Sequence, residues 1–283
     1  KRARNMALLN IGWSVGGAVG PFLAGPLYVM DYRLPFVFIF MLAVGVGFIL
    51  IIIPDERRYF GEAAAEALQL RAAHDKASEA FLLSAWCATF ASHICVGSTR
   101  AIFPKRMDDI IAAGDLRLLF EAEPLAFLNA AAATRFSWLA VALGLATGLV
   151  FYYFGRSGWW HHRFSVPAGI QILTAAAMWT LGYTHSLLIM LLCFSVIGAN
   201  LGVAFFSIGF YGMANPLQKH RRAAINEGVV GMGGLVGGIG FALVAEQAGI
   251  EAPFYGMPLV MAAIILIEFL LIRKNHVRLT QSA

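Results

Sequence analysis

Residues 16–26 read GGAVGPFLAGP and place four glycines and two prolines inside an otherwise apolar run. Glycine and proline weaken a helix in water, but in lipid small residues let neighbouring helices approach closely. Gly12, Gly16 and Gly20 recur every four residues, so they form one smooth stripe on a helix. Pro21 removes a backbone donor and bends the helix. The stretch therefore predicts a close-packed, kinked transmembrane helix.

The composition of the chain is that of a membrane protein. Of the 283 residues, 59% are hydrophobic and 13% are charged, against about 25% charged in soluble domains. A helix needs roughly 20 mainly apolar residues to cross the bilayer. The stretches of this kind are 5–30, 34–53, 80–99, 131–154, 164–183, 187–212, 225–246 and 253–272. We therefore predict an all-α, polytopic integral membrane protein with eight transmembrane helices.

The positive charges predict how the chain is oriented. Fifteen of the 21 Lys and Arg residues fall on the side that holds both termini, and six fall on the other side. Cytoplasmic loops retain Lys and Arg, so both termini are predicted to be cytoplasmic, in a bacterial inner membrane or a plasma membrane. The basic residues are scattered over several short loops, which argues against a nucleic-acid-binding surface.

The chain shows no metal-site spacing and no enzyme motif in the structural context that the motif requires. Cys87, Cys95 and Cys193 lie inside predicted spans without a CxxC or Cys/His metal spacing, where thiols pack as small apolar groups. HExxH and Walker motifs do not occur. GWSVG at 12–16 has the GxSxG spacing but lies inside an apolar, glycine-rich predicted span, away from the strand-to-helix turn that this motif requires. In WWHHR at 159–163 the adjacent histidines point in different directions on a helix, so we expect an interfacial aromatic loop. The sequence predicts no metal, no cofactor and no enzymatic activity.

The two ends of the chain repeat one another. Segment 1–53 and segment 222–274 each begin with basic residues, continue through a glycine-rich helix, and reach Pro-Phe and a second apolar span. Basic residues follow that span in both, Arg57 and Arg58 in the first and Arg273 and Lys274 in the second. The matched positions are Asn5 with Asn226, Gly12 with Gly233, Gly16 with Gly237 and Gly17 with Gly238. Repeated halves around a midplane site are a common plan of secondary transporters.

The repeat divides the chain into unequal parts. Residues 1–53 hold two spans, and 54–79 are an alanine-rich, charged stretch predicted to form a cytoplasmic linker with a surface helix. Residues 80–275 hold six spans, and 276–283 are predicted to form a cytoplasmic tail. If the halves are equal, the first lacks its first four helices. The chain begins at Lys1 without a signal peptide, a start that looks like an interior cut.

The opening stretch resembles the antiporter motif on helix five of the major facilitator superfamily, whose core runs Gly-x3-Gly-Pro-x2-Gly-Gly. The matching positions here are Gly16, Gly20, Pro21 and Gly25, with Ala24 in place of one glycine and Ala7 in place of an earlier one. Residues 154–158, FGRSG, followed by Arg163, are similar to the family's basic loop between helices eight and nine, without its acidic residue.

The resemblance implies helices five to twelve of a twelve-helix transporter that moves a small solute by alternating access, with export or antiport favoured. It also implies that the missing N-terminal helices are needed for transport. The packing positions on the two glycine helices are Gly12, Gly16, Gly20, Pro21, Gly25, Gly233 and Gly237. The partners expected are membrane lipid, a small-molecule solute, and protons or another coupling ion.

Polar residues inside the predicted spans are candidates for a substrate path, because they are costly in lipid unless they face a cavity or a partner. The candidates are Trp86, Thr89, His93, Arg100, Arg135, Trp138, Gln171, Asn200 and Tyr211. On the third span Trp86, Thr89, His93 and Arg100 recur at spacings of three, four and seven, so these four residues share a face. Each has a structural alternative, namely a hydrogen bond between helices, snorkelling to the headgroups, or an interfacial anchor.

Two titratable residues are candidates for coupling or gating. His93 accepts a proton near neutral pH, and Glu227 lies at the cytoplasmic mouth of the seventh span, where a helix cap is the alternative. Glu246 and Glu268 lie close to span ends, so we expect them to reach headgroup water. Residues 104–130 are predicted to form an outer loop with a short surface helix.

Three functions follow from these observations, and secondary transport is favoured. A non-transporting membrane scaffold or assembly partner with the same fold would fill the centre of the bundle with apolar packing. A transporter would bring Thr89, His93, Arg135 and Asn200 to a water-accessible central cavity. A polytopic membrane enzyme, the third alternative, would cluster polar groups with catalytic geometry at one membrane face.

Overall fold

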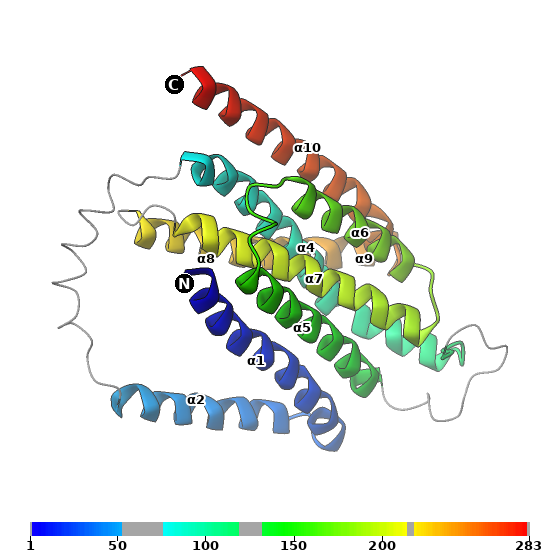
Figure 1. Ribbon diagram of the computed structural model, residues 1–283. Coiled ribbons are helices and arrows are strands. Elements are labelled where there is room, and N and C mark those ends of the chain that lie inside the picture. The colour runs from blue at the N-terminus through cyan, green and yellow to red at the C-terminus, as the bar shows by residue number, and fades with distance from the viewer. Residues whose placement is uncertain (1, 53–75, 119–131, 214–217, 282–283) are drawn as a thin grey trace.

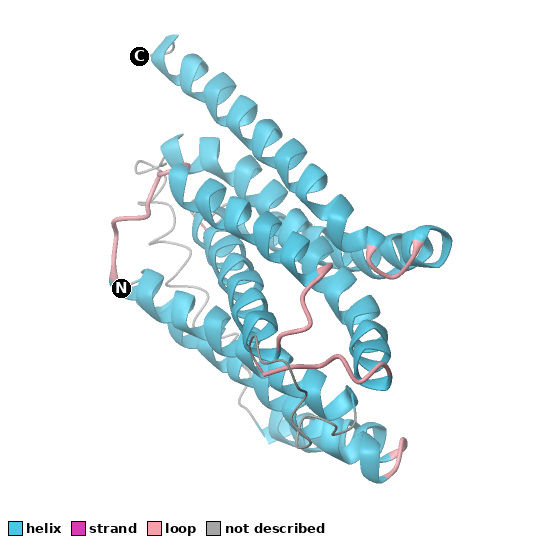
Figure 2. Ribbon diagram, turned by 90° about the vertical axis from the view of Figure 1, so that its right-hand side faces the viewer, coloured by secondary structure: helices cyan, strands magenta, loops and turns pink. Residues whose placement is uncertain are grey.

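The structure is a computed structural model that describes residues 2–52, 76–118, 132–213 and 218–281. Within these ranges the chain is helical, without a strand and with one isolated bridge between Arg117 and Ser186 (Figure 2). The helices are α1 (Arg2–Met30), α2 (Leu34–Ile52), α4 (Lys76–Ala112), α5 (Ala132–Arg156), α6 (Ser165–Leu181), α7 (Leu187–Gly212), α8 (Lys219–Leu235), the π-helical η4 (Val236–Gly240), α9 (Phe241–Ala248) and α10 (Ala252–Gln281).

The described helices have the length and composition of membrane spans. The segments long and apolar enough to cross a membrane are Phe81–Ala112, Ala132–Arg156, Leu187–Gly212, His220–Ala248 and Ala252–Lys274. Leu34–Ile49 and Ser165–Leu181 are apolar but shorter. The described residues therefore form an α-helical bundle with five helices suited to a polytopic membrane protein, and the count of eight spans stays a prediction.

Helix α4 is longer than the sequence predicts. It passes the predicted end at residue 99, continues through Pro104 and ends at Ala112. The surface helix or loop expected from residue 104 is therefore wrong for 104–112, which extend the span. Phe103 and Met107 are completely buried, and their packing holds this extension against the bundle.

The predicted linker and tail are described only in part. Residues 53–75 lie outside the described ranges, and residues 76–79 form the first turn of α4. Helix α10 runs on to Gln281, so residues 276–281 of the predicted tail continue the last helix, and 282–283 lie outside the described residues.

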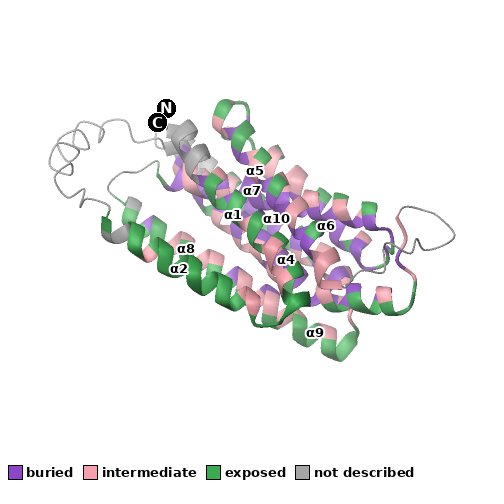
Figure 3. Ribbon diagram, turned by 90° about the horizontal axis from the view of Figure 1, so that it is seen from below, coloured by how far each residue is buried: buried purple, intermediate pink, exposed green. Residues whose placement is uncertain are grey.

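Helices α4 and α7 lie at the centre of the bundle. Helix α4 packs against α7, α8, η4 and α10, and α7 also packs against α5 and α6. Buried residues gather on these inner helices, whereas α2 and α9 show mostly exposed positions (Figure 3). Helix α1 packs along α5. The start of α1 and the end of α10 lie at the same end of the bundle (Figure 1).

Glycines let several of these helices touch through their backbones. A Cβ atom on Gly198 of α7 would overlap the carbonyl group of Leu143 in α5, and one on Gly237 of η4 would overlap the carbonyl group of Ile94 in α4. In lipid, close van der Waals contact supplies much of the force that holds helices together. The α5–α7 and α4–η4 contacts therefore depend on the absence of a side chain at these two positions.

Helix α1 contacts α5 through one face made of small residues. The Ser14 hydroxyl donates a hydrogen bond of 2.6 Å to the carbonyl oxygen of Gly144. A Cβ atom on Gly144 would lie 2.7 Å from the Ala18 Cβ. Nearer the end of α1, Gly25 lies against Ala133 and Ser137 of α5. The helix remains continuous through Pro21.

The predicted glycine stripe of α1 lies on the other side of the helix. A Cβ atom added to Gly12, Gly16 or Gly20 would have nothing within 4 Å among the described residues. In the second copy of the repeat, Gly233 and Gly237 lie directly against α4. In the described chain the repeat glycines of α8 and η4 therefore pack against a neighbouring helix, whereas the matching glycines of α1 do not.

Alanine at the two repeat-related positions tests this difference. We expect Gly237→Ala to lower the free energy of unfolding by about 1–3 kcal/mol, because its methyl group meets the Ile94 carbonyl. Gly16→Ala is the matched control and is expected to leave stability unchanged or slightly higher, because nothing lies near the added methyl group. SDS titration of residues 1–283 in mixed micelles measures both. An equal loss in the two variants would contradict the described packing.

Candidate functional site

Four helices bring aromatic and polar side chains together on one surface, which we call the central face and define as Trp13, Trp86, His93, Phe205 and Asn226. The Trp13 ring of α1 stacks on the Phe205 ring of α7, with centroids 5.0 Å apart and planes 4° from parallel. The His93 ring of α4 lies 6.2 Å from Phe205. Trp86 Nε1 donates a 2.6 Å hydrogen bond to Asn226 Oδ1 of α8.

His93 has one ring nitrogen engaged and one available. Its Nδ1 lies 2.9 Å from the Thr89 carbonyl oxygen, one turn earlier, and 3.5 Å from the Ser92 hydroxyl. The carbonyl fixes Nδ1 as the protonated donor. Nε2 forms no hydrogen bond with the described residues and is left as an acceptor beside the central face.

Two of the predicted substrate contacts lie between helices instead of on this face. The Thr89 hydroxyl donates to the carbonyl oxygens of Ala85, at 2.8 Å, and Ala204, at 3.3 Å. It is completely buried and joins α4 to α7. Asn200 is 1% exposed, and its amide nitrogen has no partner among the described residues. The predicted convergence of Thr89, His93, Arg135 and Asn200 is not observed in the described cavities.

The other candidates are spread along the bundle. Arg100 is exposed on α4, and Arg135 is partly buried in the first turn of α5. Trp138 is half exposed and meets the Phe22 ring edge to face at 5.6 Å. Glu227 is exposed near the start of α8, next to the central face through Asn226.

The motif glycines of α1 border an apolar cavity. Gly20, Pro21 and Gly25 line a space of about 630 Å³ between α1, α2 and α5, together with apolar side chains such as Phe36 and Phe136. The lining offers almost no hydrogen-bonding group. The cavity therefore suits hydrocarbon and gives no basis for recognising a polar solute.

Glu268 lies in a position that the sequence interpretation missed. We expected it to reach headgroup water, but it is 0% exposed. Gln171 Nε2 of α6 donates to Glu268 Oε1 at 2.7 Å, and the Ser84 hydroxyl of α4 lies 3.4 Å from Oε2. The residues Phe254, Met257, Met261 and Ile264 precede Glu268 at spacings of three and four and are all buried. That stripe was the available signal that Glu268 faces the bundle.

The connection between α5 and α6 packs against the ends of α5 and α7. Trp160 is 2% exposed and stacks on Phe154 with centroids 4.7 Å apart, and its Nε1 donates to the carbonyl oxygens of Phe154 and Ser157. The predicted interfacial loop is therefore wrong for Trp160, which is a core residue, whereas Trp159 is exposed. Tyr211, predicted as a substrate contact, uses its hydroxyl to accept the His162 backbone N–H at 3.0 Å.

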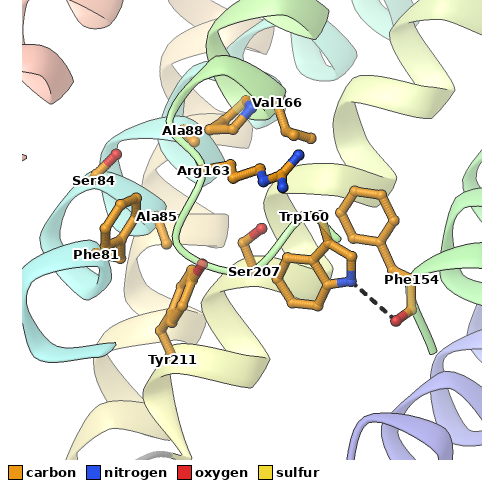
Figure 4. A pocket seen from close by; sticks show the side chains of 11 residues that line it. Phe81, Ser84, Ala85, Ala88, Phe154, Trp160, Arg163, Val166, Ser207 and Tyr211 are labelled. Atoms are coloured by element: carbon orange, nitrogen blue, oxygen red, sulfur yellow. Dashed lines mark hydrogen bonds between the residues drawn. The ribbon is translucent and has the colours of Figure 1, made fainter. Parts of the chain in front are cut away.

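A small cavity lies beside this connection. It has a volume of about 20 Å³ and is bordered by Ser84, Trp160, Arg163, Ser207 and Tyr211, among others (Figure 4). A space of this size holds about one water molecule. In Figure 4 Ser84 lies across the cavity from Trp160 and Phe154, with Arg163 between them.

Ion pairs hold both ends of α4. Arg222 of α8 pairs with Glu79 in the first turn of α4. At the other end, Arg106 pairs with Glu251 at 2.6 Å and donates through Nε to the Leu181 carbonyl oxygen at 2.9 Å. Arg106 and Arg222 are almost completely buried. These contacts fix α4 to α8 at one end, and to α6 and the α9–α10 turn at the other.

Comparisons with known proteins give no relative for this chain: no family model, no curated protein and no solved structure matches it. Within the described ranges, no three His, Cys, Asp or Glu side chains are placed to hold a metal ion together.

His161 makes the packing of the α5–α6 connection depend on pH. Its ring stacks on Phe210 with centroids 4.5 Å apart, and its buried Nε2 lacks a partner among the described residues. Burial, followed by the nearby charge of His162, lowers the pKa of His161. The folded state thus favours the neutral ring, so this stabilisation is present above pH about 6.5 and is lost as the pH falls through the lowered pKa.

We expect the melting temperature to fall between about pH 7.5 and about pH 5, a range that spans the ordinary histidine pKa. His161→Phe keeps the ring stack without a titrating group and is expected to show a smaller fall. His185→Phe, at an exposed position, is the control and should behave as the wild type. Thermal unfolding at both pH values decides the matter, and an equal fall in wild type and His161→Phe would count against the role of His161.

Proposed function

We propose that the chain is part of a secondary active transporter of the major facilitator type, which moves a small solute across the membrane by alternating access. The observation that carries the proposal is the central face. Trp13 belongs to the first pair of predicted spans, whereas His93 and Phe205 belong to the six-span unit. The face thus joins the two predicted halves, where transporters with repeated halves bind their substrates.

The chemistry of the central face suits reversible contact with a solute. Trp13 is 49% exposed although it stacks on Phe205, so its other face is available for stacking. His93 Nε2 is an acceptor beside these rings. The hydrogen bond between Trp86 and Asn226 adds a donor and an acceptor, which become available to a solute when that bond breaks. Polar groups at this depth are costly unless they face water, a solute or another helix.

The direction of transport follows from the motif on α1. The antiporter-like run from Gly16 to Gly25 favours export or antiport, and protons or another ion are the expected coupling partner. The same proposal places the protein in a bacterial inner membrane or a plasma membrane with both termini cytoplasmic.

A membrane scaffold with the same fold is the second candidate. The observation that favours it is the buried Thr89 hydroxyl, which bonds α4 to α7, because a rigid scaffold uses such groups to fix its helices. A scaffold needs no exposed aromatic face inside the membrane, so accessibility of the central face separates the two functions.

Cysteine accessibility in the full-length protein tests the proposal without knowledge of the solute. Cys87, Cys95 and Cys193 are first replaced by serine or alanine, and Trp13→Cys and His93→Cys are introduced singly. Alternating access predicts that a membrane-impermeant maleimide labels each position from either side of sealed vesicles. Met261→Cys, at a completely buried position on α10, is the control and should react from neither side. Labelling of Trp13→Cys and His93→Cys from one side only, or from neither, would favour the scaffold.

A further inference from the structure

Glu268 combines complete burial with an incomplete set of partners. It lies where α10 packs against α4 and α6, and it is 0% exposed. Its contacts are the Gln171 amide nitrogen at 2.7 Å and the Ser84 hydroxyl at 3.4 Å. No cationic side chain of the described residues forms an ion pair with it.

A second orphaned group lies in the same contact. Gln171 is also 0% exposed, and its carbonyl oxygen Oε1 has no hydrogen-bond partner among the described residues. A buried acceptor without a donor destabilises the folded state, and a buried carboxylate without a cation destabilises it further. Glu268 and Gln171 together thus carry an uncompensated negative charge, and they lack one hydrogen-bond donor.

One proton removes both defects. A carboxyl group that carries a proton is neutral and gains an O–H donor. A carboxylic acid and an amide are complementary, because the amide N–H donates to the acid carbonyl while the acid O–H donates to the amide carbonyl. The first of these bonds is already present between Gln171 and Glu268. A proton on Oε2 supplies the donor that Gln171 Oε1 lacks.

The surroundings of Glu268 provide a route for that proton. Ser84 contacts Glu268 and also borders the cavity of about 20 Å³ next to Arg163 and Tyr211 (Figure 4). The cavity has room for about one water molecule. It lies toward the end of the bundle that holds the start of α4 and the end of α10, the end predicted to be cytoplasmic.

We propose that Glu268 is a proton-binding site, filled from the predicted cytoplasmic side through Ser84 and completed by Gln171. In the uptake step a hydronium ion in the cavity gives a proton to the Ser84 oxygen while the Ser84 hydroxyl proton passes to Glu268 Oε2. One O–H bond breaks and one forms at Ser84, the hydronium ion becomes water, and Glu268 changes from a carboxylate to a neutral acid.

The side chains around Glu268 include a thiol, an amide and an arginine, and Glu268 is the carboxyl group among them. Helix α4 contributes Cys87, which lies within electrostatic range of Glu268, and α6 contributes the neutral Gln171. Arg163 lines the same cavity as Ser84, and its guanidinium group points toward Trp160 (Figure 4). The carboxylates Glu246 of α9 and Glu251 of the α9–α10 turn lie at the opposite end of α10.

A proton at Glu268 would be the coupling ion of the proposed transporter, and this role rests on the proposed function. Proton binding at Glu268 stands whether or not the chain transports a solute. Helix α10 lies away from the central face, so coupling would pass through α4, which contacts Glu268 with Ser84 and borders the central face with Trp86 and His93.

Infrared difference spectroscopy of the full-length protein in lipid tests the proton site directly. We expect a pH-dependent C=O stretching band of a buried, protonated carboxyl group. Glu268→Gln should abolish that band, whereas Glu246→Gln, the same substitution at an exposed glutamate, should retain it. Gln171→Leu should shift the band to higher frequency, because the acid loses its amide partner. A wild-type spectrum without the band, or a band that persists in Glu268→Gln, would overturn the proposal.

A pH jump measures the route. Ser84→Ala keeps the carboxyl group and the band but should slow the appearance of the band by roughly tenfold or more, because it removes a positioned proton donor. An unchanged rate would remove Ser84 from the path. This variant also keeps the test decisive if Glu268→Gln fails to fold. A negative infrared result leaves the transport proposal intact, whereas one-sided cysteine labelling contradicts transport and leaves the infrared band unaffected.

Discussion

The close approach of helix backbones is the constraint on which the rest of the structure depends. In lipid the helices gain little from burying apolar surface, so contact between small residues has to hold them together. Helix α1 meets α5 through Ser14 and Ala18, and this contact sets where Trp13 lies. The stack of Trp13 on Phe205, which is the contribution of α1 to the central face, depends on this close approach of α1 to α5.

Helix α4 connects the parts of the molecule that matter for function. Along its length Ser84 contacts α10, Trp86 contacts α8, Thr89 contacts α7, and Arg106 holds α6 and the α9–α10 turn. A small movement of α4 would therefore change the central face and the surroundings of Glu268 together. Rigid elements with alternative packing arrangements are what couples distant sites in proteins.

Hydropathy and spacing predict the helices well and the buried faces less well. The spacing of seven residues correctly puts Trp86 and His93 on one surface, but Thr89 lies about 60° round the helix from Trp86, which is enough to turn it into α7. Periodicity shows that residues share a face and leaves open which neighbour the face meets. Glu268 shows that nearness to a span end does not imply exposure. Trp160 is buried because Phe206 and Phe210 of α7, which are distant in sequence, pack against it.

The packing of α1 on α5 positions Trp13 in the central face. Disulfide cross-linking in native membranes measures this packing most directly. A Cβ atom on Gly148 would lie 3.6 Å from the Ser14 Cβ, within the range of about 3.5–4.5 Å that a disulfide requires. In a background without native cysteines, Ser14→Cys with Gly148→Cys is predicted to cross-link on mild oxidation. Gly16→Cys with Gly148→Cys, on the opposite face of α1, is predicted to stay reduced. Failure of the first pair, or equal cross-linking of the second, would contradict the account.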